Sequence, residues 1–467
     1  MKRQCAVPRR AAASVCAGPI MSRLSLLDAT FLLVDSAVSP KHVGALQLYE
    51  RPAAAGEDFV LRLYRRLQRI PPRTPFDKKL KMRRFGLPEW VDEPSLDWDY
   101  HLRHVALPAP GNNLQLTEMI GELHERPLDR HKPLWRVYLI EGLAQRRFAI
   151  YIKIHHAYGD GMTIAFWLNH WLGGSSRSQL QTALWSPPPA GPAPESPLDS
   201  LPVSVIPELY KLALRQVMSA AGISRKRLPV PFAAPRTAFN TQVTADRSFA
   251  ILDLDLAAMR AVGRGHDATV NDVLLAVTDL ALHRYLGEHG GNTDRPLVAQ
   301  MPISLRSGSD GPGGNQVTMA LVELASGRTR SPMSRLQKIH AACRDVKNEY
   351  RALSPEATTL YIAVLELIAQ AGESLHLTDQ MPALGNVLVS NVPGPQKAAY
   401  LDGARLVGAY PVSTFAPGLV LNLTVYSYAG KLHCGLLGAR RAIPDIDHLA
   451  ELMLEAFADL QAAAKTG

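Results

Sequence analysis

The stretch RFAIYIKIHHAYGDGMTIAFWLNHWLGG, residues 147–174, decides the fold prediction. Its first part alternates with a period of two, which is typical of a β-strand, and places four large apolar side chains on one face. They are Phe148, Ile150, Ile152 and Ile154. An Asp-Gly pair at 160–161 breaks the strand, and the apolar segment that follows predicts a helix ended by two glycines. The stretch therefore predicts a strand, a polar loop and a helix in succession.

Two adjacent histidines, His155 and His156, end the predicted strand, and Asp160 and Gly161 follow closely. Successive side chains of a strand point to opposite faces, so at most one of these histidines can face a given cavity. Histidine is the usual proton carrier near neutral pH, because its ordinary pKa is about 6.5. We expect Asp160 to shape the loop or orient an imidazole. Gly161 is expected to allow a backbone conformation that a residue with a Cβ would resist.

Other interpretations of the histidine pair compete with catalysis. A bare His-His pair is most often structural, with its hydrogen bonds satisfied. Metal binding would need further ligands, which this spacing does not supply, so no metal is expected. The chain also lacks a GxSxG nucleophile elbow and a GxxxxGK[ST] phosphate loop. A base without a nucleophile favours direct attack by an activated hydroxyl on a bound thioester, whose thiolate leaves readily.

The rest of the chain predicts two mixed α/β lobes joined by a linker. The segment SPPPAGPAPESPLDSLP, 186–202, is too rich in proline for helix or sheet interiors. A basic amphipathic helix follows it, with Leu209, Leu212 and Val217 on its apolar side. Such a helix either packs on a domain or lies on an anionic bilayer. We predict an N-terminal lobe at 21–185, the linker and helix at 186–236, and a C-terminal lobe at 237–467.

Composition excludes several classes of protein. Of 467 residues, 47% are hydrophobic and 20% are charged, which excludes a wholly disordered chain and suggests two domains. The net charge of +9 favours anionic partners, but the basic residues are scattered and carry no nucleic-acid-binding motif. No stretch reaches the ~18 apolar residues of a membrane span. Residues 1–20 are interpreted as a disordered extension or an incorrectly assigned start before Met21.

Several segments, in this order along the chain, resemble the bacterial wax ester synthase/acyl-CoA:diacylglycerol acyltransferases. That family belongs to the CoA-dependent acyltransferase superfamily, with chloramphenicol acetyltransferase and the condensation domains of peptide synthetases. HHxxxDG alone does not separate these relatives, but the other segments do. The segments are LSLLDATFLLVDSAVSPKHVGALQLYE from Leu24, Pro133-Leu134-Trp135, HHAYGDG at 155–161, Asn271-Asp272, MPISLR with the later Gly314-Asn315, and SNVPGP at 390–395.

The resemblance implies roles for the motif residues. His156 is expected to be the general base, and His155 to support the site. Asp160 is expected to shape the loop through a buried ion pair, for which we expect Arg306 to be the partner. Gly161 is expected to keep an acyl channel open beside the base.

Other resemblance-based expectations concern the second lobe and the motif's surroundings. Asn271 either braces the active site or caps its helix, and SNVPGP, which contains Asn391, is expected to be a turn that helps to hold the lobes together. Pro133-Leu134-Trp135 is expected to serve mainly in core packing. Tyr158 is bulkier than is common in the motif, and we expect it to reshape the alcohol side.

The implied fold has two chloramphenicol-acetyltransferase-like lobes around a central channel. The implied activity is transfer of a fatty acyl group from acyl-CoA to diacylglycerol, to a long-chain alcohol, or to both, without a cofactor. The alternatives are a related acyltransferase with another acceptor and a non-enzymatic lipid-droplet-binding protein. We expect acyl-CoA, a lipid alcohol and a membrane surface or lipid inclusion as partners. The expected location is the cytoplasm, with peripheral attachment to the inner membrane or to inclusions.

Overall fold

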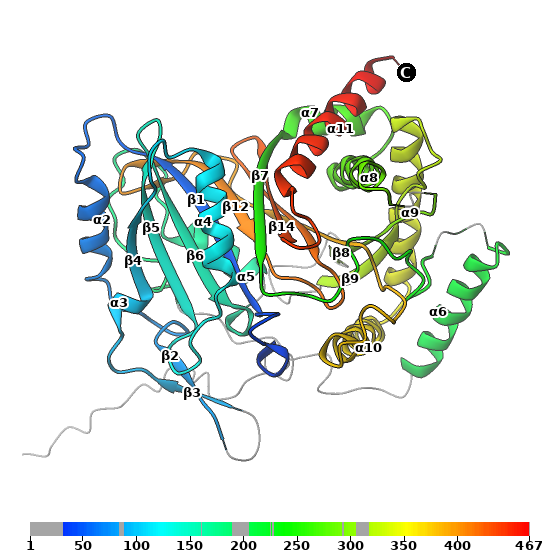
Figure 1. Cartoon of the computed structure of the whole chain (residues 1–467), viewed down its shortest axis with the longest axis horizontal. Coiled ribbons are helices and arrows are strands. Elements are labelled where there is room, and N and C mark those ends of the chain that lie inside the picture. Colours follow the sequence, from blue (N-terminus) through cyan, green and yellow to red (C-terminus); the bar gives the residue numbers. More distant parts are fainter. Residues whose placement is uncertain are drawn as a thin grey trace, which may run out of the picture.

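The structure is a computed structural model that describes residues 31–83, 88–159, 161–188, 205–224, 226, 228–291, 294–304 and 317–466. For residues 303, 304, 317, 318 and 466 it describes only the backbone. Two six-stranded sheets organise the two halves of the molecule, which we call the first and the second lobe (Figure 1). Helices and strands are interleaved along the chain, so the mixed α/β class predicted from the sequence is confirmed.

The first lobe is built on a sheet whose central strand carries the two histidines at its end. The sheet has the order β11 (Tyr400–Leu401), β12 (Ala404–Val412), β1 (His42–Glu50), β6 (Arg147–His155), β5 (Trp135–Leu143) and β4 (Leu102–Ala106). The predicted hairpin is present, because β5 and β6 pair antiparallel with Leu139 opposite Ile150. Both faces of β6 are buried from Phe148 onward, so the strand is held rigidly on both sides.

The second lobe is built on a mixed sheet. Its order is β7 (Arg247–Asp255), β14 (Lys431–Ala439), β13 (Leu421–Tyr428), β10 (Val387–Pro393), β8 (Val298–Ser304) and β9 (Val317–Glu323). β10 runs parallel to both β13 and β8. A separate two-stranded hairpin, β2 (Lys78–Lys81) with β3 (Glu89–Asp92), projects from the first lobe (Figure 1).

Helices complete both lobes. Those of the first lobe are α2 (Phe59–Leu67), α3 (Trp98–His101), α4 (Asn113–Glu125) and α5 (Gly161–His170). Those of the second are α6 (Val205–Ala220), α7 (Leu256–Arg264), α8 (Val270–Glu288), α9 (Pro332–Arg351), α10 (Pro355–Ser374) and α11 (Ile446–Thr466). α8 is buried on nearly all sides between its neighbours, which explains why its apolar side chains are spread around the helix rather than confined to one stripe.

The C-terminal part of the chain contributes strands to the first sheet. β12 comes from the C-terminal part of the sequence but pairs antiparallel with β1 of the first sheet, with Tyr410 opposite Leu46. The division into 21–185 and 237–467 that the sequence predicts does not include this contribution. Long-range strand pairing of this kind leaves no local pattern in the sequence, because each strand shows only its own alternation.

The predicted linker and helix have a mixed outcome. Residues 189–204, which hold most of the proline-rich segment, lie outside the described residues, as do residues 1–30. Ser186 belongs to the first lobe, because its hydroxyl donates to the Pro71 carbonyl at 2.7 Å. The helix is confirmed as α6, but only part of its predicted apolar side packs: Leu212 is buried, whereas Val217 is 58% exposed.

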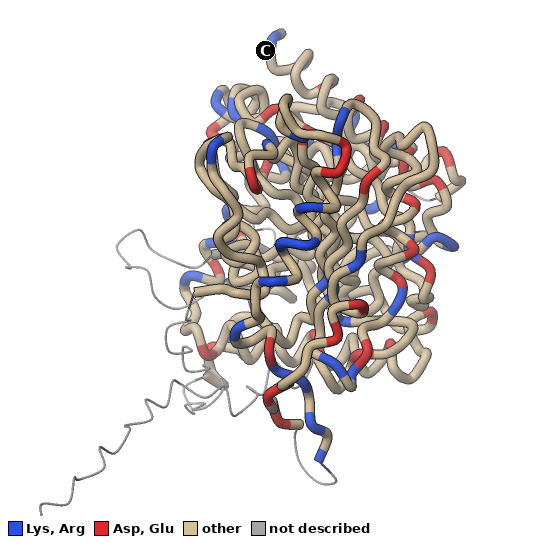
Figure 2. The backbone as a smooth tube through the Cα atoms, turned by 90° about the vertical axis from the view of Figure 1, so that its left-hand side faces the viewer, with Lys and Arg blue, Asp and Glu red and all other residues tan. Residues whose placement is uncertain are grey.

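Charged residues are distributed over the surface rather than concentrated in one track. In Figure 2, which views the molecule from the left-hand side of Figure 1, Lys and Arg are interspersed with Asp and Glu, including on the projecting β2–β3 hairpin. No single helix among the described residues is long and apolar enough to cross a membrane. α9 and α10 meet that criterion of length and composition only as a pair, and the chain bends by 118° between them.

The two sheets come into close contact where β12 packs against β14. A Cβ built on Gly435 of β14 would lie 1.9 Å from the carbonyl oxygen of Pro411 in β12, well inside van der Waals contact. Only glycine lets these backbones approach so closely. The contact therefore joins β12, a strand of the first sheet, to β14 of the second sheet.

Gly435→Ala is expected to destabilise the protein by about 1–3 kcal/mol, because the added methyl group forces the backbones of β12 and β14 apart. Urea unfolding measures this change. The matched control is Gly287→Ala in α8, where a Cβ meets nothing within 4 Å and where alanine is favoured over glycine by about 1 kcal/mol. Equal stability of the Gly435 variant and the wild type would contradict the close packing of the two sheets.

Candidate active site

The histidine motif lies at the end of β6. His155 is the last residue of the strand, His156–Tyr158 form a single 3₁₀ turn, and α5 begins at Gly161. The strand, loop and helix predicted from this stretch are therefore confirmed. Asp160 lies outside the described residues, so its predicted role in the loop remains a prediction.

His155 points into the first lobe and is only 2% exposed. Its Nδ1 accepts a hydrogen bond from the backbone N–H of Ala157 at 3.1 Å. The proton of a neutral ring is therefore on Nε2, which lies 3.6 Å from Oδ2 of Asp35. These contacts set both the orientation and the tautomer of the ring, and its supporting role in the site remains a prediction.

Asp35 is the anionic centre of this network, and the sequence interpretation missed it. Its Oδ1 accepts from the backbone N–H of Lys41 at 2.8 Å, and its Oδ2 accepts from Arg130 at 2.9 Å. Burial alone would raise the pKa of Asp35, but its interactions with His155, the Lys41 N–H and Arg130 hold that pKa below 3.8. The only sequence signal was its place in the family-like segment from Leu24.

His156 occupies a different environment from His155. Its backbone N–H donates to the Lys41 carbonyl at 2.9 Å. Its ring stacks on Phe31, with the ring centroids 4.3 Å apart and the planes at 21°. His156 is partly exposed, whereas His155 is buried, so the two adjacent rings are held by different partners. Which of the two rings faces a substrate remains a prediction.

Lys41 connects this site to the second lobe. Its ammonium is buried, lies 3.7 Å from Oε1 of Glu373 in α10, and donates to Ser39. Removal from water lowers the pKa of Lys41 despite the attraction of Glu373. Removal from water also raises the pKa of Glu366, two helical turns earlier in α10, to about 7. A buried ionic group thus ties the backbone that holds His156 to a helix of the other lobe.

Two of the expectations about the motif's neighbours are tested by the geometry. Tyr158 does not reach toward a substrate: it is 5% exposed in the first-lobe core, and its hydroxyl donates to the Lys78 carbonyl at 2.8 Å. That prediction was wrong, because the 3₁₀ turn directs the ring inward. A Cβ on Gly161, at the start of α5, would meet no described atom within 4 Å, and the predicted need for glycine's backbone freedom remains a prediction. Trp135 packs in the core, as expected, and its Nε1–H donates to the Phe76 carbonyl.

Asn271 and Asn391 form a second group in the other lobe. The Nδ2 of Asn391 donates to Oδ1 of Asn271 at 2.7 Å. Asn271 is not the helix cap, because Thr269 occupies that position and its Oγ1 accepts from the Asp272 N–H. Asn391 lies within β10, so this part of SNVPGP is strand rather than turn. Arg306, the predicted partner of Asp160, lies outside the described residues.

The two groups are joined by α5. This helix follows the histidine motif and packs against β10, the strand that carries Asn391. Asn169 near its end accepts a hydrogen bond from the hydroxyl of Tyr426 in β13 at 2.6 Å. The loop after His156 is therefore fastened to the second lobe beside the asparagine pair.

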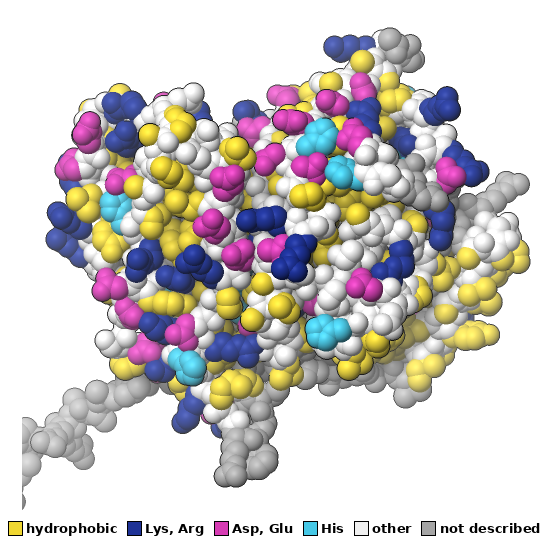
Figure 3. Space-filling model, viewed as in Figure 1, with side chains coloured by type: hydrophobic (Ala, Val, Ile, Leu, Met, Phe, Trp, Pro, Cys, Tyr) yellow, Lys and Arg dark blue, Asp and Glu magenta, His cyan; other side chains and the backbone are white. Residues whose placement is uncertain are grey.

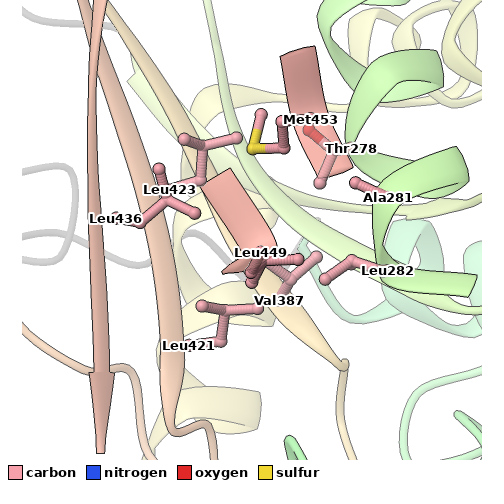
Figure 4. A pocket seen from close by; sticks show the side chains of 9 residues that line it. All are labelled: Thr278, Ala281, Leu282, Val387, Leu421, Leu423, Leu436, Leu449 and Met453. Carbon is pink, nitrogen blue, oxygen red and sulfur yellow. The ribbon is translucent and has the colours of Figure 1, made fainter. Parts of the chain in front are cut away.

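Two hollows lie elsewhere in the described structure. An apolar void of about 10 Å³ lies between α8, α11 and the second sheet. Among the side chains that line it in Figure 4, only Thr278 carries a polar group, its hydroxyl. The void is too small and too apolar for a substrate. A cleft of about 590 Å³ lies between the lobes, lined by residues 37–38 and 125–127 of the first and by 243–246 and Arg441 of the second.

Comparisons with known proteins find relatives along nearly the whole chain. Residues 24–274 match the wax ester synthase/diacylglycerol acyltransferase catalytic domain, and residues 313–461 match the WS/DGAT C-terminal domain. A putative diacylglycerol O-acyltransferase of Mycobacterium tuberculosis strain CDC 1551 is 36% identical, over 94% of this chain and 99% of that protein. A probable diacylglycerol O-acyltransferase of strain H37Rv is 35% identical, over 93% and 98%.

Solved structures agree with these relatives. A wax ester synthase/diacylglycerol acyltransferase from Marinobacter aquaeolei VT8 superimposes with a TM-score of 0.77 at 32% identity, over 95% of this chain and 100% of that chain. The starter condensation domain of rhizomide synthetase superimposes with a TM-score of 0.55 at 15% identity, over 95% of each chain. The second likeness concerns the fold alone, and it confirms the predicted two-lobed architecture.

Asp35→Asn is expected to lower stability at pH 7 by about 1–3 kcal/mol, because Arg130 and His155 lose their anionic partner. The folded state lowers the pKa of Asp35 below 3.8. Its contribution is therefore present above that pH and is lost as the pH falls through the folded value. Urea unfolding of both proteins from pH 7 downward should show the difference shrinking toward acid pH.

The control for this experiment is Asp99→Asn, which changes an exposed carboxylate in the same lobe. It should leave stability within about 0.5 kcal/mol of the wild type. A stability difference for Asp35→Asn that is independent of pH would contradict the assignment of an ionised, hydrogen-bonded carboxylate.

Proposed function

The chain belongs to the wax ester synthase/diacylglycerol acyltransferase family, and from this premise we propose that His156 acts as general base in acyl transfer. The donor is a fatty acyl-CoA, and the acceptor is diacylglycerol, which yields triacylglycerol, or a long-chain alcohol, which yields a wax ester. The relatives of this chain are named as diacylglycerol O-acyltransferases, and the similar solved structure is named for both activities.

The observation that carries the proposal is the division of roles between the two histidines. His155 is buried and oriented by Asp35. His156 is partly exposed, and its backbone N–H donates to the Lys41 carbonyl. The His156 ring is thus held in place although it is not buried in the lobe. Its backbone partner, Lys41, also contacts α10, which supports a site where the lobes meet.

The proposed reaction proceeds without an acyl-enzyme. His156 takes the proton of the acceptor hydroxyl while the oxygen attacks the carbonyl carbon of the thioester. The tetrahedral oxyanion then collapses, the carbon–sulfur bond breaks, and the CoA thiolate leaves and is protonated by the imidazolium. Positioned general-base catalysis of this kind contributes a rate factor of about 10²–10⁴. No cofactor is required, because the thioester itself carries the activated acyl group.

Other residues support this chemistry. His155 and Asp35 fix the end of β6, and the Asn271–Asn391 pair fixes the start of α8 against β10. We propose that Asp160 pairs with Arg306 to shape the loop and that Gly161 leaves room for the acyl chain. The space beside Gly161, where a Cβ meets no described atom, supports the latter role.

The acceptors are lipids, so we propose that the protein works at the cytoplasmic surface of the membrane or on lipid inclusions. A peptide-synthetase-like acceptor has support only from the condensation-domain fold at 15% identity. A non-enzymatic lipid-droplet-binding role would not depend on His156. The same experiment separates these alternatives.

Thiol release from palmitoyl-CoA, with diolein and hexadecanol offered separately, tests the proposal. Release by the wild type is expected to require an alcohol, and the preferred acceptor identifies the main activity. His156→Ala is expected to reduce the rate by about 10²–10⁴, because the base is removed. His170→Ala is the matched control: His170 is exposed on the adjacent helix α5 and should leave the rate unchanged.

Two results would oppose the assignment. Folded wild-type protein that releases no thiol with either alcohol would overturn the lipid acceptors. A His156→Ala protein that keeps full activity would overturn the base, and one that keeps its full effect on cellular lipid stores would support the droplet-binding alternative.

The asparagine pair is expected to act as one unit in catalysis. Asn271→Ala and Asn391→Ala should each lower kcat by roughly tenfold, because loss of one hydrogen bond of about 1.4 kcal/mol releases the start of α8. The double variant should be no slower than either single variant, because both changes remove the same bond. Thiol-release kinetics of the three variants measure this coupling, and Asn348→Ala, an exposed change, is the control. Additive losses would show that the two side chains act independently.

A further inference from the structure

The outer face of α10 is apolar where a helix on a protein surface is normally polar. Exposed side chains recur every three or four residues, which places them in one stripe along the helix. The stripe consists of Val364, Leu367, Ile368, Ala371 and Leu375, with Leu367 exposed by 64% and Leu375 by 67%. It contains no charged side chain.

α6 extends this surface. Its buried face, with Val205 and Leu212, packs against the first half of α10, where Ala357 is also buried. Its other face is again apolar and exposed, at Ile206, Tyr210, Leu214 and Val217. Figure 3 shows the hydrophobic side chains gathered along the edge of the molecule formed by α6 and α10. Two neighbouring helices thus present one continuous apolar surface, which we call the α6–α10 face.

The described charged residues in and just after α6 are mainly basic, with Glu208 in its first turn as the exception, and α10 carries Glu356 in its first turn. Lys211 and Arg215 flank the apolar stripe of α6, and Lys226 follows the helix. The only carboxylate that pairs with Arg215 and Lys226 in the described structure is Glu349, which is buried beneath them. Two cations therefore share one buried anion, and a positive charge remains at the surface. Apolar side chains bordered by Lys and Arg are typical of helices that lie in the interface of an anionic bilayer.

The geometry points to the α6–α10 face as the surface by which this protein docks on an anionic lipid bilayer. The inference rests on the proposed function in one respect: both proposed acceptors are lipids, so the enzyme must reach them at a lipid surface. A second copy of the chain is a poorer occupant, because two such faces would bring like charges together in a protein of net charge +9.

The docking face lies on the same helix that contacts the candidate active site. Leu367 and Ile368 face outward from α10, while Glu373 on its buried side lies 3.7 Å from the Lys41 ammonium. The carbonyl of Lys41 in turn accepts from the His156 backbone N–H. One helix therefore separates the lipid surface from the backbone that positions the base.

Vesicle flotation tests the inference, with vesicles of equal parts phosphatidylcholine and phosphatidylglycerol. The wild type is expected to float with the vesicles. The double variant Leu367→Glu, Ile368→Glu should bind the vesicles at least about tenfold less tightly. Two apolar side chains that would enter the bilayer are replaced by charges that anionic lipid repels. The matched control is Leu114→Glu, Leu454→Glu, which places the same two charges at similarly exposed positions on α4 and α11.

Activity in a vesicle-free assay with a short, water-soluble alcohol separates this inference from the proposed function. The double variant should release thiol there at the wild-type rate, and His156→Ala should bind vesicles like the wild type while releasing thiol about 10²–10⁴ times more slowly. Vesicle binding that is equal in wild type and double variant, or missing in both, would overturn the docking face. A wild type that is dimeric without vesicles, together with a double variant that is monomeric, would also overturn the docking face and assign it to self-association.

Discussion

The ionised carboxylate of Asp35 is the interaction on which the candidate site depends. It accepts hydrogen bonds from Arg130 and from the backbone of Lys41, and it faces the Nε2 of His155. These partners come from the start of β1, the end of β6 and the loop before β5. One carboxylate therefore holds together the three segments that surround the end of the strand, and the position of His156 follows from them.

The second requirement is that the lobes stay joined around this point. β12 leaves the second half of the chain to pair with β1, and it crosses β14 at Gly435, where only glycine fits. The Lys41–Glu373 contact and the Asn169–Tyr426 hydrogen bond join the lobes again on either side of the histidine motif. A chain with two lobes can thus hold a base from one lobe in a fixed relation to groups from the other. For an acyltransferase with two substrates, such fixed positioning accounts for a large part of rate enhancement.

Local patterns predicted much of this protein. The alternation before His155 predicted β6, the glycines after Trp171 predicted the end of α5, and the ordered family-like segments predicted the fold. Each of these signals depends on residues close together in the chain. The failures have a different origin: Tyr158 was assigned to a substrate face because its spacing in the motif does not reveal which way a 3₁₀ turn directs the ring.

The sequence by itself determined the strand–loop–helix unit, the position of the histidine pair at the end of the strand and the family. These follow from backbone periodicity and from motifs that lie within a few residues. Only the tertiary structure decided that Asp35 orients His155, that Asn391 bonds Asn271 rather than leaving it to cap α8, and that β12 joins the first sheet. The physical reason is distance along the chain: partners separated by more than a hundred residues meet only when packing brings their elements together.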